Sequence, residues 1–172
     1  MKAKYLFFLL AAAAALGSLA GCKGSDPTSP PPPSSQYGSV VGKVAANFTA
    51  VDQNGQSVSL YSYQGKVILI DFSADWCVPC QNEAAKAEAL YQSYKDQGFV
   101  MLTILIDGSP STWATTYGLS FPVLDDTSRT LWGIYGEGYI PLNIVLDRTM
   151  TIRYKVAGYN ESDIVGMIQK YL

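Results

Sequence analysis

The stretch that decides the fold reads Val67-Ile68-Leu69-Ile70-Asp71-Phe72-Ser73-Ala74-Asp75-Trp76-Cys77-Val78-Pro79-Cys80. Its first six residues, 67–72, form a near-continuous apolar run, which is typical of a strand covered on both faces. Helical spacing begins at Val78 and continues to about Gln97, and Gly98 ends the segment. A second apolar run, Phe99–Ile106, follows directly. Strand, helix and strand in this order predict a right-handed parallel crossover.

The segments on either side of this crossover complete a mixed sheet. Before it, Phe48–Val51 and Ser57–Leu60 flank a loop containing Asn54-Gly55, which is a hairpin signal. After it we expect a helix over Ser111–Tyr117, a strand over Phe121–Leu124 and a helix over Thr127–Tyr135. An antiparallel strand pair, Leu142–Leu146 with Thr151–Val156, and a closing helix over Glu161–Leu172 follow. The predicted fold class is α/β, with a central sheet that is parallel first and antiparallel last, helices on both sides and an extra N-terminal β-hairpin.

Composition excludes several classes of function. Apolar residues make up 48% of the 172 residues and charged residues only 15%, so wholesale disorder is excluded. The formal net charge is -2 and there is no basic stretch, so nucleic acid is not an expected partner. The chain has no histidine, which excludes Ser-His-Asp catalysis, Cys-His catalysis and every histidine-ligated metal. We expect no metal or other cofactor, and we expect a monomer.

The first 21 residues have the features of an export signal. Lys2 and Lys4 precede an uninterrupted apolar run of 12 residues, Tyr5–Leu16. Spanning a bilayer takes about 20 apolar residues, so we predict a cleaved leader over residues 1–21.

The end of this leader, Leu19-Ala20-Gly21-Cys22, resembles the lipobox of bacterial lipoproteins. The resemblance implies cleavage before Cys22 and a thioether-linked diacylglycerol on its sulfur. The alternative is an ordinary leader that leaves Cys22 free. Since a lone thiol is a liability in an oxidising space, the lipobox is favoured.

Residues 22–36 form a Pro/Ser-rich segment that includes Pro30–Pro33. Such a composition buries no core and tends toward extended polyproline, so we predict a lipid-anchored tether followed by a folded domain over residues 37–172. The expected location is the bacterial cell envelope, anchored by the lipid and facing the periplasm or the outside. Which membrane holds the anchor is left open.

Two cysteines lie where a buried strand meets a long helix. The free N–H groups at the start of the helix stabilise a thiolate at Cys77, and Cys80 lies one turn further on. Attack by Cys77 on a substrate disulfide gives a mixed disulfide that Cys80 resolves. A zinc site would need four ligands, and a structural disulfide across two residues constrains almost no loop. The pattern therefore favours redox chemistry.

This stretch resembles the thioredoxin superfamily, and the chain from about Val44 to Leu172 is similar to its exported branch, the TlpA/ResA-like thiol-disulfide oxidoreductases. Further matching features are Gly65-Lys66, Glu83, Phe121–Asp125 and Ile140-Pro141. The resemblance implies that Pro141 is cis and faces the disulfide, with the substrate chain held nearby. It makes Trp76, Ile140 and Pro141 the expected substrate-binding residues, with Trp76 packing beside the disulfide and shielding it.

Two acidic residues are further candidates. Asp71 lies inside an apolar strand, where burial disfavours the charged form, so it is expected to stay protonated to high pH and to accept the proton of Cys80. The alternative is an aspartate at a frayed strand end that faces water. Glu83 either couples to the thiols, as the resemblance implies, or is a solvated residue in the first turn of the helix. Asp75 and Glu137 are expected to be solvated.

The chain departs from the TlpA/ResA-like pattern at three places. It has Glu83-Ala84-Ala85 where the branch has Glu-x-Pro, Asp71 where the branch has Asn, and Leu142 where the family tends to have Thr. These changes leave the cysteine chemistry intact and leave the substrate open.

The function expected from these residues is that of an exported, membrane-anchored thiol-disulfide oxidoreductase. It would reduce disulfides of exported proteins and take electrons from a membrane donor. One alternative is a peroxiredoxin-like thiol peroxidase, although such an enzyme has Thr three residues before its cysteine and this chain has Ala74. Another alternative is a non-catalytic thioredoxin-like binding or assembly module, against which the presence of both cysteines argues.

Overall fold

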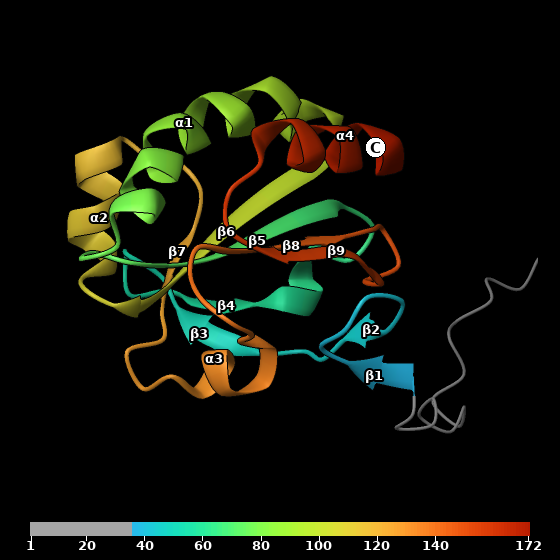
Figure 1. The fold of residues 1–172 in the computed structure, drawn as a ribbon, viewed down its shortest axis with the longest axis horizontal. Coiled ribbons are helices and arrows are strands. Elements are labelled where there is room, and N and C mark those ends of the chain that lie inside the picture. Colours follow the sequence, from blue (N-terminus) through green and yellow to red (C-terminus); the bar gives the residue numbers. More distant parts are fainter. Residues whose placement is uncertain (1–35) are drawn as a thin grey trace, which may run out of the picture. The chain divides into compact units, whose positions relative to one another are not determined.

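The centre of the fold is a mixed five-stranded sheet. The computed structural model describes residues 36–172 of the chain. In spatial order the strands are β7 (Val123–Asp125), β6 (Phe99–Asp107), β5 (Val67–Ala74), β8 (Leu142–Leu146) and β9 (Ile152–Ala157). The first three are parallel to one another, β8 is antiparallel to β5, and β9 is antiparallel to β8. The predicted order of a parallel part followed by an antiparallel part is confirmed (Figure 1).

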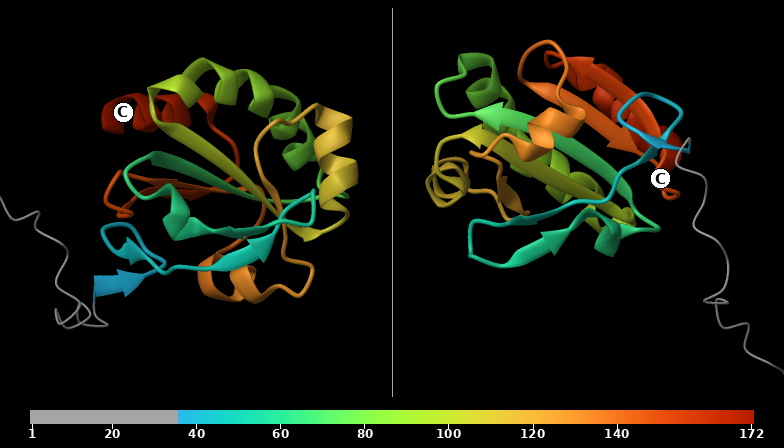
Figure 2. Two further views of the ribbon diagram at one scale, coloured as in Figure 1. Left: turned by 180° about the vertical axis from the view of Figure 1, so that it is seen from behind. Right: turned by 90° about the horizontal axis from the view of Figure 1, so that it is seen from below.

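Helices cover both faces of this sheet. They are α1 (Val78–Tyr94), α2 (Pro110–Tyr117), α3 (Thr130–Tyr135) and α4 (Glu161–Tyr171). Helices α1 and α4 lie on one face, α3 lies on the other, and α2 lies beside the edge strand β7 (Figures 1 and 2). Because both faces are covered, all eight residues of β5 are buried. This burial explains the apolar run from which the fold was predicted.

The long helix ends where the sequence indicates. After Tyr94 the chain makes a 3-10 turn over Lys95–Gln97, and Gly98 then takes a φ of 91°. Glycine adopts this left-handed conformation without a steric penalty from a side chain, which is why it caps the segment and turns the chain into β6.

The predicted N-terminal hairpin is present. Its strands are β3 (Thr49–Val51) and β4 (Ser57–Ser59), paired antiparallel, with a 3-10 turn at Leu60–Tyr63 after them. The loop is closed by Asp52, whose Oδ1 accepts hydrogen bonds from two backbone N–H groups at 2.8 Å each. Gln53 fastens this loop to the β7 segment by donating to the carbonyl of Phe121 and accepting from the N–H of Val123. The hairpin is therefore tied to the main sheet.

Two short strands were not predicted. These are β1 (Tyr37–Gly38) and β2 (Val44–Ala45), which pair parallel. The same segment hydrogen-bonds with the start of β9 through Gly42 and Lys43, each of which bonds to the backbone of Ile152. It thereby covers part of a sheet edge that would otherwise expose unpaired backbone groups. Two-residue strands carry no measurable alternation, so sequence periodicity could not reveal them.

Two predicted elements begin more than one residue away from the observed start. The strand predicted from Phe121 begins at Val123, and Pro122 between them has no N–H to donate to a ladder. The helix predicted from Thr127 begins at Thr130, because the carboxylate of Asp126 accepts the N–H groups of Leu131 and Trp132. Such capping fixes where a helix starts.

The predicted leader over residues 1–21, the lipobox cysteine Cys22 and the tether up to residue 35 lie outside the described residues. Among residues 36–172, no helix has the length and apolar character needed to cross a bilayer.

Candidate active site

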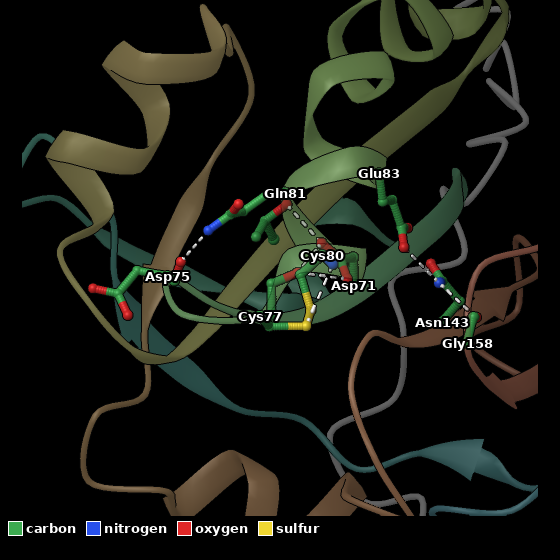
Figure 3. The surroundings of a disulfide bond; sticks show 10 residues. Asp71, Asp75, Cys77, Cys80, Gln81, Glu83, Asn143 and Gly158 are labelled. Carbon is green, nitrogen blue, oxygen red and sulfur yellow. Dashed lines mark hydrogen bonds between the residues drawn. A yellow bond between two sulfur atoms is a disulfide. The ribbon is translucent and has the colours of Figure 1, made fainter.

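The two predicted redox cysteines form a disulfide at the start of α1 (Figure 3). Their Cα atoms are 5.2 Å apart. Cys77 is the N-cap of the helix, and its sulfur accepts a hydrogen bond from the backbone N–H of Cys80 at 3.3 Å. The junction with β5 is held by a bond from the N–H of Cys77 to the carbonyl of Ala74 at 3.2 Å. The sulfur of Cys77 therefore lies at the end of α1 whose N–H groups and dipole stabilise a negative charge.

The two sulfurs differ in accessibility. Cys77 is 5% exposed and Cys80 is fully buried. Cys77 is thus the outer residue of the pair, although it lies nearly flush with its surroundings and does not project from them. A disulfide of a partner protein can reach only the outer sulfur, while the inner one faces the core.

Asp71 lies behind the disulfide, in the middle of β5 (Figure 3). It is 1% exposed, so the alternative of a frayed strand end facing water is wrong. Its carboxylate accepts hydrogen bonds from the hydroxyls of Ser73, at 2.8 and 3.0 Å, and Thr103, at 3.3 Å. Burial raises the pKa of Asp71 to about 7, although the bonds from Ser73 and Thr103 act in the opposite direction. A carboxyl with this pKa can accept a proton and release it near neutral pH.

Glu83 is the second buried acid. It follows Cys80 by three residues on α1 and is 1% exposed, so the solvated alternative is wrong. One of its oxygens, Oε2, accepts a hydrogen bond at 3.1 Å from the side-chain amide of Asn143. Burial, reinforced by the nearby charge of Asp71, raises the pKa of Glu83 to about 9. Burial therefore raises the pKa of both acids and favours their protonated forms.

Asn143 lies beside both acids and was not among the predicted site residues. It lies on β8 directly opposite Asp71, so both side chains point to the same face of the sheet. Its amide also donates to the carbonyl of Gly158 at 3.3 Å. Two buried oxygens, Oε1 of Glu83 and Oδ1 of Asn143, have no hydrogen-bond donor among the described residues. Without a donor to Oε1, the charged form of Glu83 lacks a hydrogen bond that would stabilise it, which agrees with the raised pKa of Glu83.

The expected substrate-binding residues differ in their surroundings. The bond between Ile140 and Pro141 is cis; Pro141 is buried and Ile140 is half-buried. Trp76 is 60% exposed, and its indole N–H donates to a carboxylate oxygen of Asp107 at 3.0 Å. Most of the Trp76 side chain therefore faces solvent, and its role in shielding the disulfide stays a prediction.

The two acids expected to be solvated are both exposed. The carboxylate of Asp75 points away from the disulfide in Figure 3, and its backbone carbonyl accepts a bond from Gln81. Glu137 forms an ion pair with Lys155 at 3.0 Å. Within residues 36–172 no group of three or more cysteine, aspartate or glutamate side chains could hold a metal ion.

The chain is similar to known thiol-disulfide oxidoreductases. The model of the AhpC/TSA family matches residues 41–155. Thiol-disulfide oxidoreductase ResA of Geobacillus thermodenitrificans is 30% identical over 122 residues, covering 69% of this chain and 70% of that protein. ResA of Bacillus thuringiensis is 28% identical over 134 residues, covering 76% and 78%. Among solved structures, the exposed lipoprotein thioredoxin of Streptococcus pneumoniae superposes with a TM-score of 0.62 at 25% identity, covering 73% of this chain and 99% of that one.

Proposed function

This chain belongs to the AhpC/TSA family and is a thiol-disulfide oxidoreductase of the ResA type, and from this premise we propose that it reduces disulfides of exported proteins. The observation that carries the proposal is the layered arrangement around one disulfide. Cys77 is the more exposed cysteine and lies at a helix N-terminus, Cys80 is fully buried, and Asp71 lies behind the disulfide, while Glu83 is buried further along the same helix. Its substrates are proteins that carry disulfides or thiols.

The first step in the proposed reaction uses the reduced enzyme. The thiolate of Cys77 attacks one sulfur of the substrate disulfide. A new S–S bond forms between Cys77 and the substrate, and the second substrate sulfur leaves as a thiolate. The N–H group of Cys80 and the dipole of α1 favour the thiolate that begins this step.

The second step releases the substrate. Cys80 gives its thiol proton to the carboxylate of Asp71, and its sulfur then attacks the sulfur of Cys77. The bond between Cys77 and the substrate breaks, the substrate leaves as a thiolate, and the Cys77–Cys80 disulfide forms. We assign the role of proton acceptor to Asp71, which lies on the strand that leads to Cys77 and whose carboxylate accepts hydrogen bonds from two hydroxyl groups. Two electrons pass from the enzyme dithiol to the substrate.

The enzyme then needs a dithiol donor. Reduction of the Cys77–Cys80 disulfide by an external dithiol of the membrane restores both thiols and oxidises the donor by the same two electrons. A donor in the membrane fits an enzyme that is itself anchored there.

The anchor is proposed to be a diacylglycerol on Cys22, with residues 22–36 as a tether to the domain that starts at Tyr37. The lipobox-like sequence supports it, and the similar pneumococcal thioredoxin is described as an exposed lipoprotein. The corresponding location is the cell envelope. Intact mass spectrometry should find a mature chain that begins at Cys22 with added diacylglycerol. A different first residue, or a Cys22 that reacts with iodoacetamide, contradicts the anchor.

Disulfide reduction itself can be tested with purified protein. Fully reduced protein, freed of reductant, is mixed with an excess of a cyclic disulfide peptide, and both partners are followed by mass. We expect one peptide disulfide to be reduced for each Cys77–Cys80 disulfide formed. Hydrogen peroxide is the comparison oxidant. If peroxide oxidises Cys77 rapidly and the peptide does not, the chain is a thiol peroxidase, and if neither reacts it is a binding module.

A further inference from the structure

A cavity of about 350 Å³ lies next to the disulfide and has no part in the reaction steps above. Its walls include Trp76, which directly precedes Cys77, and Ile140, which directly precedes Pro141. Trp132 and Tyr139 supply two further aromatic rings, and Arg129 supplies a positive charge. We refer to this cavity with these five side chains as the aromatic pocket.

Two of the three rings of the aromatic pocket are exposed to solvent. Tyr139 is 66% exposed and Trp76 is 60% exposed, and no other large aromatic side chain in residues 36–172 is as exposed. The third ring, that of Trp132, packs edge-on against Phe72 of β5, with 5.6 Å between the ring centroids. Exposed aromatic rings grouped beside a reactive residue are typical of a surface that contacts a partner.

Arg129 is the one charged residue that lines this pocket. Within the described part of the chain its guanidinium takes part in no ion pair, and its side chain is exposed. Its backbone is fixed, because its N–H donates to the carbonyl of Asp126 at 2.7 Å and its own carbonyl accepts from Gly133 at 2.9 Å. Its φ of 58° is a left-handed conformation that costs free energy for a residue other than glycine. The chain therefore holds a charged side chain at a position where glycine would be easier to accommodate.

The charges around Trp76 are arranged asymmetrically. Its indole N–H is bonded to the exposed Asp107, and Asp75 is its neighbour in the chain. Both are acidic, and neither lines the aromatic pocket, where the only charge is the positive one of Arg129. A negative group on a bound substrate is therefore attracted into the pocket and repelled from the other side of Trp76.

We propose that the aromatic pocket binds the segment of a substrate protein next to its reactive cysteine, and that it selects a segment with an apolar side chain and an adjacent carboxylate. The apolar side chain contacts the rings of Trp76, Trp132 and Tyr139. The carboxylate pairs with the guanidinium of Arg129, whose planar fork matches its two oxygens. This inference rests on the proposed disulfide reduction and names the substrate class for it.

Three cyclic peptides with one disulfide test the proposal. They share a leucine beside one cysteine and differ only in the next residue, which is Glu, Gln or Lys. With reduced wild-type protein, we expect the rate constant of reduction to be about threefold to fivefold higher for the Glu peptide than for the Gln peptide, which is the range of a partly solvated ion pair. The Lys peptide should react more slowly than the Gln peptide. High salt should diminish these ratios.

Arg129→Gln should equalise the three peptides, and Arg129→Glu should reverse their order. Lys66→Gln is the matched control, since it removes one exposed positive charge at the far end of β5 and should leave the ratios of the wild type unchanged. Because the side chain of Arg129 is exposed, these variants should fold like the wild type, which thermal unfolding checks.

Equal rates for all three peptides in the wild type would overturn the proposal, as would Arg129→Gln slowing all three by one common factor. Wild-type protein that reduces none of the peptides, nor any other disulfide, would instead overturn the reductase function on which the proposal rests.

Discussion

The two sides of the disulfide differ in the polarity of the side chains that surround it. On the inner side, polar groups of Asp71, Glu83, Thr103 and Asn143 are buried in a core that is otherwise apolar. On the outer side, apolar rings of Trp76 and Tyr139 face solvent. Each side reverses the usual preference of polar groups for the surface and of apolar groups for the interior.

We assign a different task to each side, proton transfer to the inner side and substrate binding to the outer side. Burial shifts the pKa of the inner carboxyls toward the range in which thiols exchange protons, and we propose that the inner side sets the rate and pH dependence of resolution. The exposed rings of the outer side contribute little to the core, so this side is free to bind a partner. Variants of the inner side should change the rate of the chemical step and the stability, whereas variants of the outer side should change capture of the substrate alone.

The largest effect is expected at the point where both sides meet. Cys77→Ser removes the sulfur that attacks the substrate, and an alcohol at this position is not a usable nucleophile near neutral pH. Peptide disulfide reduction should fall by at least about 10³-fold. The rate is measured with reduced protein in excess over the peptide. Residual reduction within tenfold of the wild type would show that Cys80 can attack substrate by itself, and the inner and outer assignments would be wrong.

Asp71→Asn tests the inner side with nearly unchanged shape. The variant lacks the proton acceptor for Cys80, so release of substrate from the mixed disulfide should slow by about 10- to 100-fold at pH 7. The midpoint of thermal unfolding should stay equal or rise, since a buried carboxyl that ionises is replaced by a neutral amide. Stopped-flow measurement separates the first step from the second. Slowing of the first step alone would contradict the assigned role of Asp71.

Trp76→Ala tests the outer side. With 60% of the side chain exposed, the loss should lower kcat/KM for peptide substrates by about threefold to tenfold through weaker binding, with kcat little changed. The unfolding midpoint should remain close to that of the wild type. A fall in kcat with unchanged KM would place Trp76 in the chemical step, and the separation of tasks would fail.

The last effect concerns the free energy of unfolding of the oxidised protein as a function of pH. Asp71 and Glu83 have a higher pKa in the folded state than in the unfolded chain, so the folded state binds more protons between about pH 4 and pH 9. Stability should therefore fall as the pH rises through this window. The double variant Asp71→Asn, Glu83→Gln should remove most of this slope. Replacing the exposed Asp96 with Asn should leave the slope intact, and a slope that persists in the double variant contradicts the account.

Local sequence was enough to predict part of the site. The apolar run of β5 indicated that Asp71 is buried, and the start of helical spacing located Cys77 at an N-terminus. The burial of Glu83 could also have been found. Cys80, Glu83, Ala84 and Ala87 follow the spacing of one helix face, and all four are buried. Glu83 is the one charged residue among these four, so its burial was left undecided.

Other features depend on contacts between distant segments. Thr103 and Asn143 flank Asp71 only because β6 and β8 pair with β5 in one particular register. Register is set by the whole sheet, and a shift of one residue would point each side chain to the other face. In the local sequence of β8, only the polar Asn143 inside the apolar run Leu142–Leu146 indicates that this strand contributes to the site. The hydrogen bond of the Trp76 indole likewise joins distant segments, since its acceptor Asp107 lies 31 positions away at the end of β6.

The central claim is that substrate is captured covalently by the outer sulfur and released by the inner one. Trapping with Cys80→Ser measures this most directly, because the attacking thiol remains while the resolving thiol is absent. Reduced Cys80→Ser protein mixed with a cyclic disulfide peptide should accumulate a species with the combined mass of both, linked through Cys77 and dispersed by reductant. The Cys77→Ser protein should form no such species. If Cys80→Ser traps no peptide, or the linked peptide maps to a residue other than Cys77, the account is wrong.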